Sequence, residues 1–422
     1  MARKMKDSGI EWIGEIPEGW EVGQIGQLYS ERRTKVSDKD YSPLSVTMKG
    51  ILPQLSTAAK TDAHDDRKLV CKGDFAINSR SDRRGSCGIS EQDGSISLIN
   101  TVLQPRGEMN PGYYNWLFHT SMFADEFYKW GHGIVDDLWT TGWSDMKKIG
   151  VPVPSKCEQK QLAEHLNFEC SNIDTILSKT RSSIEEYKKL KQAVITQAVT
   201  KGVRGEREMK DSGNPWFGQI PTDWKLSRVG LHFSIILGKM LCNAPLNDTY
   251  TLEPYYCAAD VHFDGVADGE RKKMWFSPIE KDLYRVSVGD LLVVEGGAGA
   301  GGSAIVENQD SYTYIQNSIM IVRSKGNTDN RYLRYLLEFL VKQGYIDIVC
   351  NKATIPHFTK DKLSCVPFCL CPTGEQKEIA DYLDAKCAEI DRLIAKKEQL
   401  VKELEGYKKS LIYEVVTGKR EV

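Results

Sequence analysis

The sequence predicts two α/β (α+β) domains in a pseudo-two-fold arrangement, separated by an antiparallel coiled coil of two long helices. Three observations lead to this fold class: an opening segment that occurs twice, a long helical pattern in each copy, and mixed helix and strand signals between them. Internal repetition defines the structural unit, so it takes precedence over other architectural signals. Because two units are too few for a solenoid, we expect a molecule built from two equivalent halves.

The opening segment occurs at residues 5–20 and again at residues 209–224, where ten of the sixteen positions are identical at an offset of 204 residues. The tripeptide Glu-Gln-Lys recurs at residues 158–160 and 375–377, at an offset of 217 residues, and starts each helical pattern. The repeated unit is therefore an opening segment, a variable stretch and a long helix.

The repeat divides the chain into four segments. A chain of 422 residues is long enough for two or three domains with cores of their own. We expect a first domain over residues 1–154, a first long helix over 155–202, a second domain over 203–372 and a second long helix over 373–422.

The composition, with 41% hydrophobic and 27% charged residues, is that of an ordinary soluble protein, and we expect it to be cytoplasmic. No apolar run reaches the roughly 18 residues that span a bilayer, and the N-terminus lacks the apolar region of a secretory signal. Eleven cysteines without a disulfide-like spacing predict reduced thiols. The net charge of −2 argues against a free-standing nucleic-acid binder but is compatible with a local basic patch inside a larger assembly.

Two stretches, from Glu158 to Thr200 and from Glu375 to Thr417, contain no proline and only one glycine, Gly406. Prolines precede each stretch and a glycine follows each, which are helix start and stop signals. Ser155 is the expected N-cap of the first helix, and Thr373 or Gly374 that of the second.

Apolar residues recur at steps of three, four or seven along both helices, which is typical of a coiled-coil seam. The two seams share one register, and so we expect each helix to pair with the other; the alternative is a coiled coil that dimerises the protein. The seam residues are Ile173, Leu177, Ile184, Tyr187, Val194, Ile390, Ile394, Val401, Leu404 and Leu411.

The variable stretches share a frame but differ in their loops. Gly73-Asp74 and Gly289-Asp290 each precede an apolar run that reads as a turn followed by a strand. The loop after the first strand carries arginines, whereas the loop after the second is rich in glycine. Arginine can fork onto guanine or phosphate, and glycine lets the backbone approach a ligand closely.

The loops and the segments before the long helices supply candidate nucleic-acid contacts, although each of these side chains can equally lie on a solvated surface loop. Trp139 has a further alternative, which is a place in the core. The candidates are Lys49, Ser79, Arg80, Arg83, Arg84, Trp139, Thr140, Lys239, Arg271, Lys272, Glu295, Gly297, Lys352, Thr354 and His357.

The sequence contains no set of catalytic residues of its own. The Gly296–Gly302 loop lacks the lysine of a phosphate-binding loop, and Asn214-Pro215-Trp216-Phe217 lacks the second proline of the Asn-Pro-Pro-Phe signature of amino-methyltransferases. Cys365, Cys369 and Cys371 are close in sequence but lack the second pair of ligands that a zinc site needs. We therefore expect a protein that is not an enzyme and holds no metal.

Several motifs together resemble the DNA-specificity (S) subunits of type I restriction–modification systems. They are the opening "SGIEWIGEIPEGW", the junctions "VPVP…EQK" and "VPF…GEQK", the Ile-Asp pairs at residues 173–174 and 390–391, and the endings "QAVTKG" and "YEVVTGKREV". The resemblance covers the whole chain, since both repeats and both helices occur in order.

The resemblance implies a non-catalytic subunit in which each variable stretch is a target recognition domain for one half of a split double-stranded DNA site. It further implies that the helix pair sets the spacing between the halves and docks two methyltransferase (M) subunits, to which restriction (R) subunits can bind. This chain would hold no cofactor; S-adenosylmethionine for adenine N6 methylation would belong to M, and ATP and Mg to R. Two alternatives are an assembly scaffold and a methyltransferase with its own active site.

Overall fold

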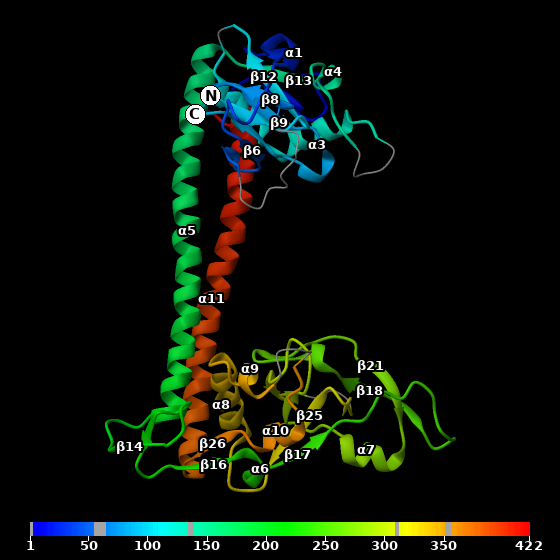
Figure 1. Cartoon of the computed structure of the whole chain (residues 1–422), viewed down its shortest axis with the longest axis vertical. Coiled ribbons are helices and arrows are strands. Elements are labelled where there is room, and N and C mark those ends of the chain that lie inside the picture. Colours follow the sequence, from blue (N-terminus) through cyan, green and yellow to red (C-terminus); the bar gives the residue numbers. More distant parts are fainter. Residues whose placement is uncertain (1–2, 55–64, 108, 134–138, 309–311, 351–355) are drawn as a thin grey trace. The chain divides into compact units, whose positions relative to one another are not determined.

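The computed structural model describes residues 3–54, 65–107, 109–133, 139–308, 312–350 and 356–422. The chain divides into two compact units, a first unit of Met1–Arg181 with Glu398–Val422 and a second unit of Ser182–Lys397. Each unit contains an α/β body and a part of both long helices, α5 (Lys156–Lys201) and α11 (Thr373–Val416) (Figure 1). The division by contacts therefore runs through the helices, and the four-segment division stays a prediction.

The first unit is built on an antiparallel sheet of order β10-β9-β12-β4, beside a three-stranded sheet of order β11-β8-β5. Its helices, apart from α5 and α11, are α1 (Ile25–Leu28), α2 (Pro111–Phe118), α3 (Ser121–Lys129) and α4 (Trp143–Met146). Its strands are β1 (Met5–Asp7), β2 (Glu15–Pro17), β3 (Glu21–Gln24), β4 (Tyr29–Glu31), β5 (Lys35–Val36), β6 (Leu44–Thr47), β7 (Gly50–Pro53), β8 (Arg67–Val70), β9 (Phe75–Asn78), β10 (Cys87–Ile89), β11 (Gly94–Ile96), β12 (Asn100–Pro105) and β13 (Gly150–Val153).

The second unit has a four-stranded antiparallel sheet of order β17-β25-β22-β23 and a three-stranded sheet of order β21-β18-β24. Its helices are α6 (Val229–His232), α7 (Pro278–Tyr284), α8 (Asn330–Lys342), α9 (Tyr345–Val349) and α10 (Lys360–Ser364). Its strands are β14 (Met209–Asp211), β15 (Gln219–Pro221), β16 (Lys225–Arg228), β17 (Phe233–Leu237), β18 (Thr251–Tyr256), β19 (Val261–His262), β20 (Gly265–Val266), β21 (Lys272–Phe276), β22 (Leu291–Val294), β23 (Ser303–Ile305), β24 (Tyr314–Ile315), β25 (Ile319–Ser324) and β26 (Pro367–Leu370).

The two four-stranded sheets have the same topology. β10, β9, β12 and β4 of the first unit correspond to β23, β22, β25 and β17 of the second, in the same spatial order. The strand that precedes each long helix also pairs with the equivalent strand of its own unit: β13 pairs with β3, and β26 pairs with β16. β22 is buried at every position, which explains its unbroken apolar run. The expected class of repeated α/β domains with two long helices packed together is confirmed.

The predicted ends of the long helices are close to the observed ones. Ser155 caps α5 in a capping box: its hydroxyl accepts from the Glu158 amide at 3.3 Å, and its own amide donates to the Glu158 carboxylate at 3.2 Å. The expected cap by Thr373 or Gly374 is wrong, because α11 begins at Thr373 and the Gln376 amide donates to the Pro372 carbonyl at 3.0 Å.

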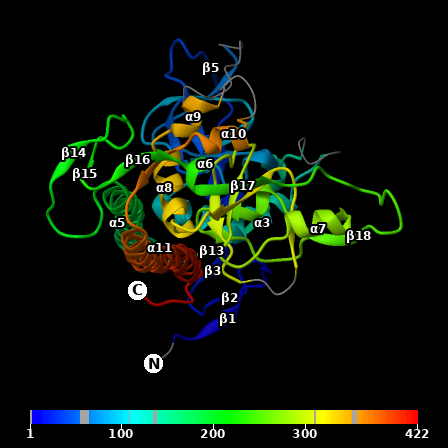
Figure 2. The ribbon, with the colours of Figure 1, turned by 90° about the horizontal axis from the view of Figure 1, so that it is seen from below.

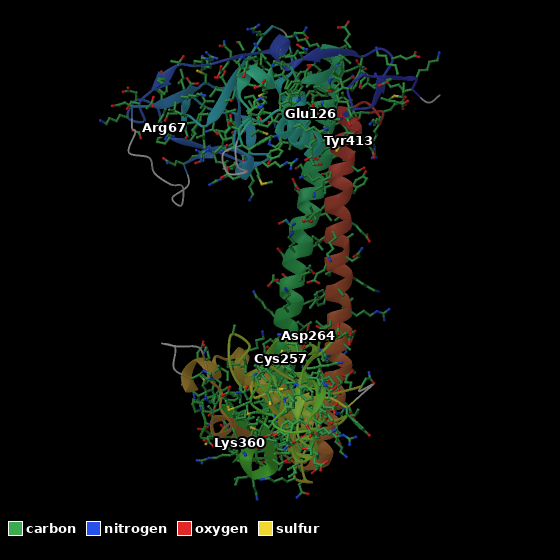
Figure 3. All side chains as sticks on the ribbon, turned by 90° about the vertical axis from the view of Figure 1, so that its right-hand side faces the viewer. Arg67, Glu126, Cys257, Asp264, Lys360 and Tyr413 are labelled. Carbon is green, nitrogen blue, oxygen red and sulfur yellow. The ribbon has the colours of Figure 1, made fainter. Side chains whose placement is uncertain are left out.

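Each opening segment packs against the end of a long helix, which explains why both copies keep their tryptophans. In the first unit Tyr413 lies on α11 (Figure 3) and its hydroxyl donates to the Ile13 carbonyl at 3.1 Å, and Trp20 is fully buried. In the second unit the β14–β15 hairpin lies beside the end of α5 (Figure 2), and the equivalent Trp224 is also fully buried. Among the described residues, no helix is both long and apolar enough to span a bilayer.

Candidate nucleic-acid interface

The turn before the central strand is built in the same way in both units. Gly73 and Gly289 both have φ = +88°, a left-handed conformation that favours glycine. The carboxylates of the next residues, Asp74 and Asp290, are buried and each accepts a hydrogen bond from the backbone three residues earlier, at 2.9 Å and 2.8 Å.

Each of these aspartates is also held by an arginine, but from a different strand. Arg32, which follows β4, donates to Asp74 at 2.6 Å, and Arg323, on β25, donates to Asp290 at 2.7 Å. The hydrogen bond to the aspartate raises the pKa of each guanidinium above its ordinary value. The shared turn therefore places the loops after β9 and β22 at equivalent points of the two units.

The structure brings the two groups of candidate loops together. The Thr141 amide donates to the Ser79 carbonyl at 3.0 Å, and Arg80 forms a β-bridge with Thr140. In the second unit the Phe358 amide donates to the Glu295 carbonyl at 2.6 Å, and Gly296 forms a β-bridge with His357. We call these short antiparallel ribbons, residues 79–80 with 140–141 and residues 295–296 with 357–358, the loop ladders.

The ladder of the first unit presents a cation. Arg80 and Thr140 are exposed, while the Ser79 hydroxyl is bonded to Thr101 at 2.9 Å. The neighbouring Arg83 is exposed over 68% of its side chain and lies 3.6 Å from the Asp82 carboxylate. Arg84 is 46% exposed, forms an ion pair with Asp125 and lies 5.1 Å from the centroid of the Tyr128 ring. All three arginines of this loop are exposed, and Arg80 is the one that lies on the ladder.

The ladder of the second unit presents an anion and an imidazole. The Glu295 carboxylate lies 3.6 Å from Nδ1 of His357, whose side chain is 60% exposed, whereas that of Glu295 is 18% exposed. Gly297 has φ = +90° and its amide donates to the Pro356 carbonyl at 3.2 Å, which holds the glycine loop against the ladder. Lys352 and Thr354 lie outside the described residues.

Trp139 belongs to the packing of the first unit. Its ring stacks on Tyr128 with the centroids 5.9 Å apart, and its indole nitrogen donates to the Tyr128 carbonyl at 2.9 Å. The pocket that Trp139 and Tyr128 line has a volume of about 20 Å³, which is room for water but not for a nucleobase.

Two cationic candidates are held in internal contacts, which a sequence pattern could not show. Lys239 is 8% exposed and forms an ion pair with Glu280 at 2.5 Å. Arg271 pairs with Asp260 at 3.0 Å and lies over the Tyr256 ring. These cations are already neutralised within the unit.

Two further candidates are exposed and lie outside the ladders. Lys49 occupies the turn between β6 and β7, and Lys272 lies on the outer strand β21. All the candidates stay predictions as DNA contacts.

The ten seam residues are all at least half-buried. Those that are fully buried are Ile173, Leu177, Ile184, Ile390 and Leu411, and those that are half-buried are Tyr187, Val194, Ile394, Val401 and Leu404.

Polar positions in the seam bond across the two helices. In the first unit Lys408 donates to Asp174 at 2.6 Å, and in the second unit Lys191 donates to Asp391 at 2.6 Å. In both units the helices are antiparallel, and the same lysine–aspartate pair sets their register.

The glutamine of the repeated Glu-Gln-Lys tripeptide has a structural role that sequence reasoning missed. Gln159 accepts from the Asn110 amide at 2.9 Å and donates to the Pro154 carbonyl at 2.8 Å. Gln376 accepts from the Asp329 amide at 3.0 Å and donates to the Cys371 carbonyl at 2.7 Å. Each glutamine side chain therefore connects the start of a long helix to the N-cap residue of α2 or α8. The repeat of the tripeptide in the sequence was the signal from which this role could have been predicted.

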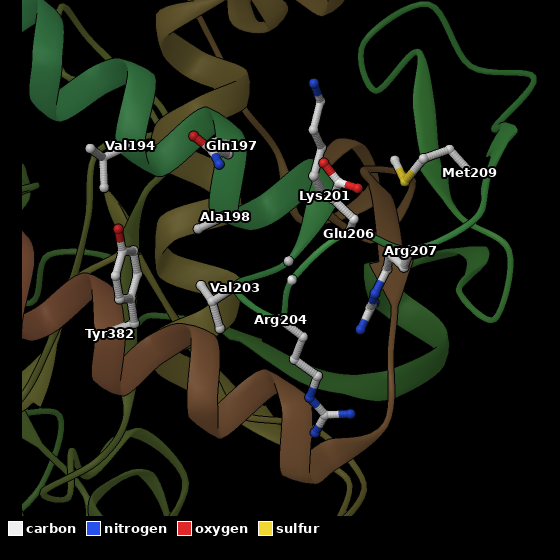
Figure 4. Close-up of a pocket in the computed structure, with 12 residues that line it drawn as sticks. Val194, Gln197, Ala198, Lys201, Val203, Arg204, Glu206, Arg207, Met209 and Tyr382 are labelled. Carbon is white, nitrogen blue, oxygen red and sulfur yellow. The ribbon is translucent and has the colours of Figure 1, made fainter.

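A surface pocket of about 600 Å³ lies where α5 leads into the second opening segment (Figure 4). The two arginines that line it are neutralised by α11: Arg204 donates to Glu378 twice at 2.8 Å, and Arg207 donates to the buried carboxylate of Glu375 at 2.7 Å. Arg207 also lies over the Trp224 ring, as Arg3 lies over Trp20 in the first unit. The pocket is thus part of the packing that joins the opening segment to the helices.

Of the three close cysteines, Cys369 and Cys371 have the environment of apolar core residues, whereas Cys365 is exposed. Burial raises the pKa of the Cys371 thiol to about 12 and that of Cys369 still further, which disfavours the thiolate that binds zinc. Within the described residues, no group of three or more His, Cys, Asp or Glu side chains is placed to hold a metal ion.

Three comparisons with known proteins agree with the expected resemblance. Residues 222–403 match the family model described as "Type I restriction modification DNA specificity domain". Two relatives from Methanocaldococcus jannaschii are the MjaX and MjaVIII specificity subunits of type I restriction enzymes. The first is 25% identical over 435 residues (96% of this chain and 95% of the relative), and the second is 24% identical over 432 residues (96% and 93%).

Two solved structures share the fold. A chain from a study of complex assembly and conformational transition of the type I R-M system has a TM-score of 0.72 at 15% identity, covering 96% of this chain and 99% of that one. The HsdS subunit from Thermoanaerobacter tengcongensis has a TM-score of 0.55 at 17% identity, covering 96% and 98%. The resemblance to type I specificity subunits that the motifs predicted is confirmed.

Proposed function

We propose that this chain, which carries the type I restriction–modification DNA specificity domain at residues 222–403, is the non-catalytic specificity subunit of such a system in the cytoplasm. Each unit reads one half of a bipartite double-stranded DNA site. The observation that carries the proposal is the loop ladder: both units place it at the same point of the same sheet topology, yet the side chains on the two ladders differ. A shared frame with divergent loops suits a protein that reads two different sequences.

We further propose that α5 and α11 fix the distance between the half-sites and dock two M subunits. Each M subunit uses S-adenosylmethionine to methylate adenine at N6, and R subunits that use ATP and Mg join through M. The cross-helix lysine–aspartate pairs support this role, because they set the register of the helices in each unit. A net charge of −2 fits a subunit whose partners supply much of the positive charge that faces phosphate.

Methylome sequencing of host DNA after co-expression of this chain with its M subunit tests the proposal. We expect one split motif with N6-methyladenine in each half and a constant gap. A chain that assembles with M but produces methylation without a two-part motif would contradict the two-reader function.

The two alternatives make different predictions. A methyltransferase with its own active site binds S-adenosylmethionine as the isolated chain, which titration calorimetry measures. An assembly scaffold is indifferent to DNA, so charge reversal at Arg80 and Arg83 would leave DNA binding by the complex unchanged. Both arginines are exposed, which makes the reversal a surface change.

A further inference from the structure

The two loop ladders have the same backbone hydrogen bonds but carry different side chains. Thr141 and Phe358 donate to Ser79 and Glu295 in the same way, and the bridges beside these bonds are equivalent. The side chains at the matched positions nevertheless change from Ser79-Arg80 to Glu295-Gly296, and from Thr140 to His357. By contrast, the turn aspartates and the helix-start glutamines are the same residue type in both units.

The shape of the ladder suits the major groove of DNA. The major groove admits a two-stranded β-ribbon, and base edges there present distinct donors and acceptors. A ribbon fixed by backbone hydrogen bonds holds its side chains in defined directions, as base reading requires. The exposed side chains at the ladders are Arg80, Thr140 and His357.

The charges of the two ladders point to different bases. The Arg80 guanidinium offers a fork of donors, which matches the O6 and N7 acceptors of guanine. The Glu295 carboxylate can only accept, which matches the N4 amino group of cytosine. Residues 296 and 297 are glycines and add no side chain next to Glu295, so that the exposed His357 imidazole, 3.6 Å from the carboxylate, is the side chain a base would meet beside it.

We propose that the loop ladder is the base-reading element of each unit, with Arg80 specifying a guanine in one half-site and Glu295, beside His357, specifying a cytosine in the other. This inference rests on the proposed function, since it names the residues and the base chemistry of the same interface. It makes the two units opposite in hydrogen-bond polarity, so that the two half-sites differ.

The test uses the assembled complex with M and oligonucleotide duplexes in which each base pair of the methylated motif is replaced in turn. Arg80→Ala should lose about 5- to 150-fold of the preference for one guanine in a single half-site, with every other position unchanged. Arg83→Ala is the matched control, because Arg83 is exposed in the same loop and lies outside the ladder. It should weaken binding to all sequences alike.

In the second unit, Glu295→Gln should lose a cytosine preference of the same size in the other half-site. Glu307→Gln is its control, since it makes the same change at an exposed carboxylate outside the ladder. Co-purification with M and an unchanged melting temperature identify the variants that are folded and assembled.

Retention of every base preference by folded Arg80→Ala and Glu295→Gln complexes would overturn the ladder assignment. So would relaxation of the same half-site by both variants. If the unaltered complex itself shows no two-part preference, it is the proposed function that fails, and this result is distinct from either outcome above.

Discussion

The buried glutamine at the start of α11 allows a stringent test of the way the second unit is held together. Gln376 is fully buried. Its side-chain oxygen accepts a hydrogen bond from the backbone amide of Asp329, the N-cap of α8, and its side-chain nitrogen donates to the backbone carbonyl of Cys371, which follows β26. Gln376→Met keeps the length and flexibility of the side chain but removes both hydrogen bonds. Two backbone groups would then be buried without a partner.

The expected cost follows from those two groups. A buried polar group left unpaired costs about 1–3 kcal/mol, and the apolar thioether recovers a part of the sum, so we expect a net loss of about 2–4 kcal/mol. For a unit of this size, each kcal/mol lowers the melting temperature by about 2–4 °C, which gives a shift of about 4–16 °C.

Differential scanning calorimetry measures the shift and resolves the two units if they melt separately. Gln159→Met makes the equivalent change in the first unit and should lower the other transition. Gln161→Met is the matched control, because Gln161 is exposed on α5, and it should change the stability by less than about 0.5 kcal/mol. If Gln376→Met melted like Gln161→Met, the hydrogen bonds of the buried glutamine would not support the fold as argued.

Three further predictions concern the spacing, the pH dependence and a buried cation. Removing the heptads 180–186 and 396–402 together should shorten each long helix by about 10.5 Å and the gap between the half-sites by about three base pairs, as read by methylome sequencing; an unchanged gap would refute the spacing role. Burial opposes ionisation of Glu158, but hydrogen bonds from Ser155, the Trp20 indole and Arg3 outweigh it and lower its pKa below 4.5, so that Glu158→Gln should be less stable than the native chain at neutral pH. This difference should disappear as the pH falls below 4.5, where the native carboxylate also becomes protonated; a difference that persisted in acid would contradict the assignment. Lys239→Met should lower the melting temperature, because Glu280 loses its partner, while the salt dependence of DNA binding stays unchanged; a smaller slope of log affinity against log salt would identify Lys239 as a phosphate contact instead.

The frame of each unit was predictable because local patterns specify it. Glycine before aspartate marked the turns at residues 73–74 and 289–290, and Ser155 as N-cap marked the start of α5. The seam of the long helices followed from the spacing of apolar residues, since a period of three or four places them on one face. The start of α11 was less predictable, because the hydroxyl of its first residue, Thr373, donates to the carbonyl of the distant Asn327, a contact that no local motif encodes.

The candidate interface was predictable only in part. The sequence singled out the loops at residues 79–84 and 295–302 and the segments before α4 and α10, but a sequence pattern does not show that these segments pair. It also assigned equal weight to cations with different surroundings. Arg80 is exposed, whereas Lys239 is enclosed by the Tyr250 and Phe276 rings and neutralised by Glu280.

The sequence by itself determined the repeated α/β unit, the two long helices and the resemblance to type I specificity subunits, because repeats, helical period and motifs are properties of the order of residues. Only the tertiary structure decided which loop residues are exposed and which are held in internal contacts. Access to a side chain depends on partners distant in the chain, such as Glu280 for Lys239. The loop ladders likewise exist only because hydrogen bonds join residues about 60 positions apart, as between Ser79 and Thr141.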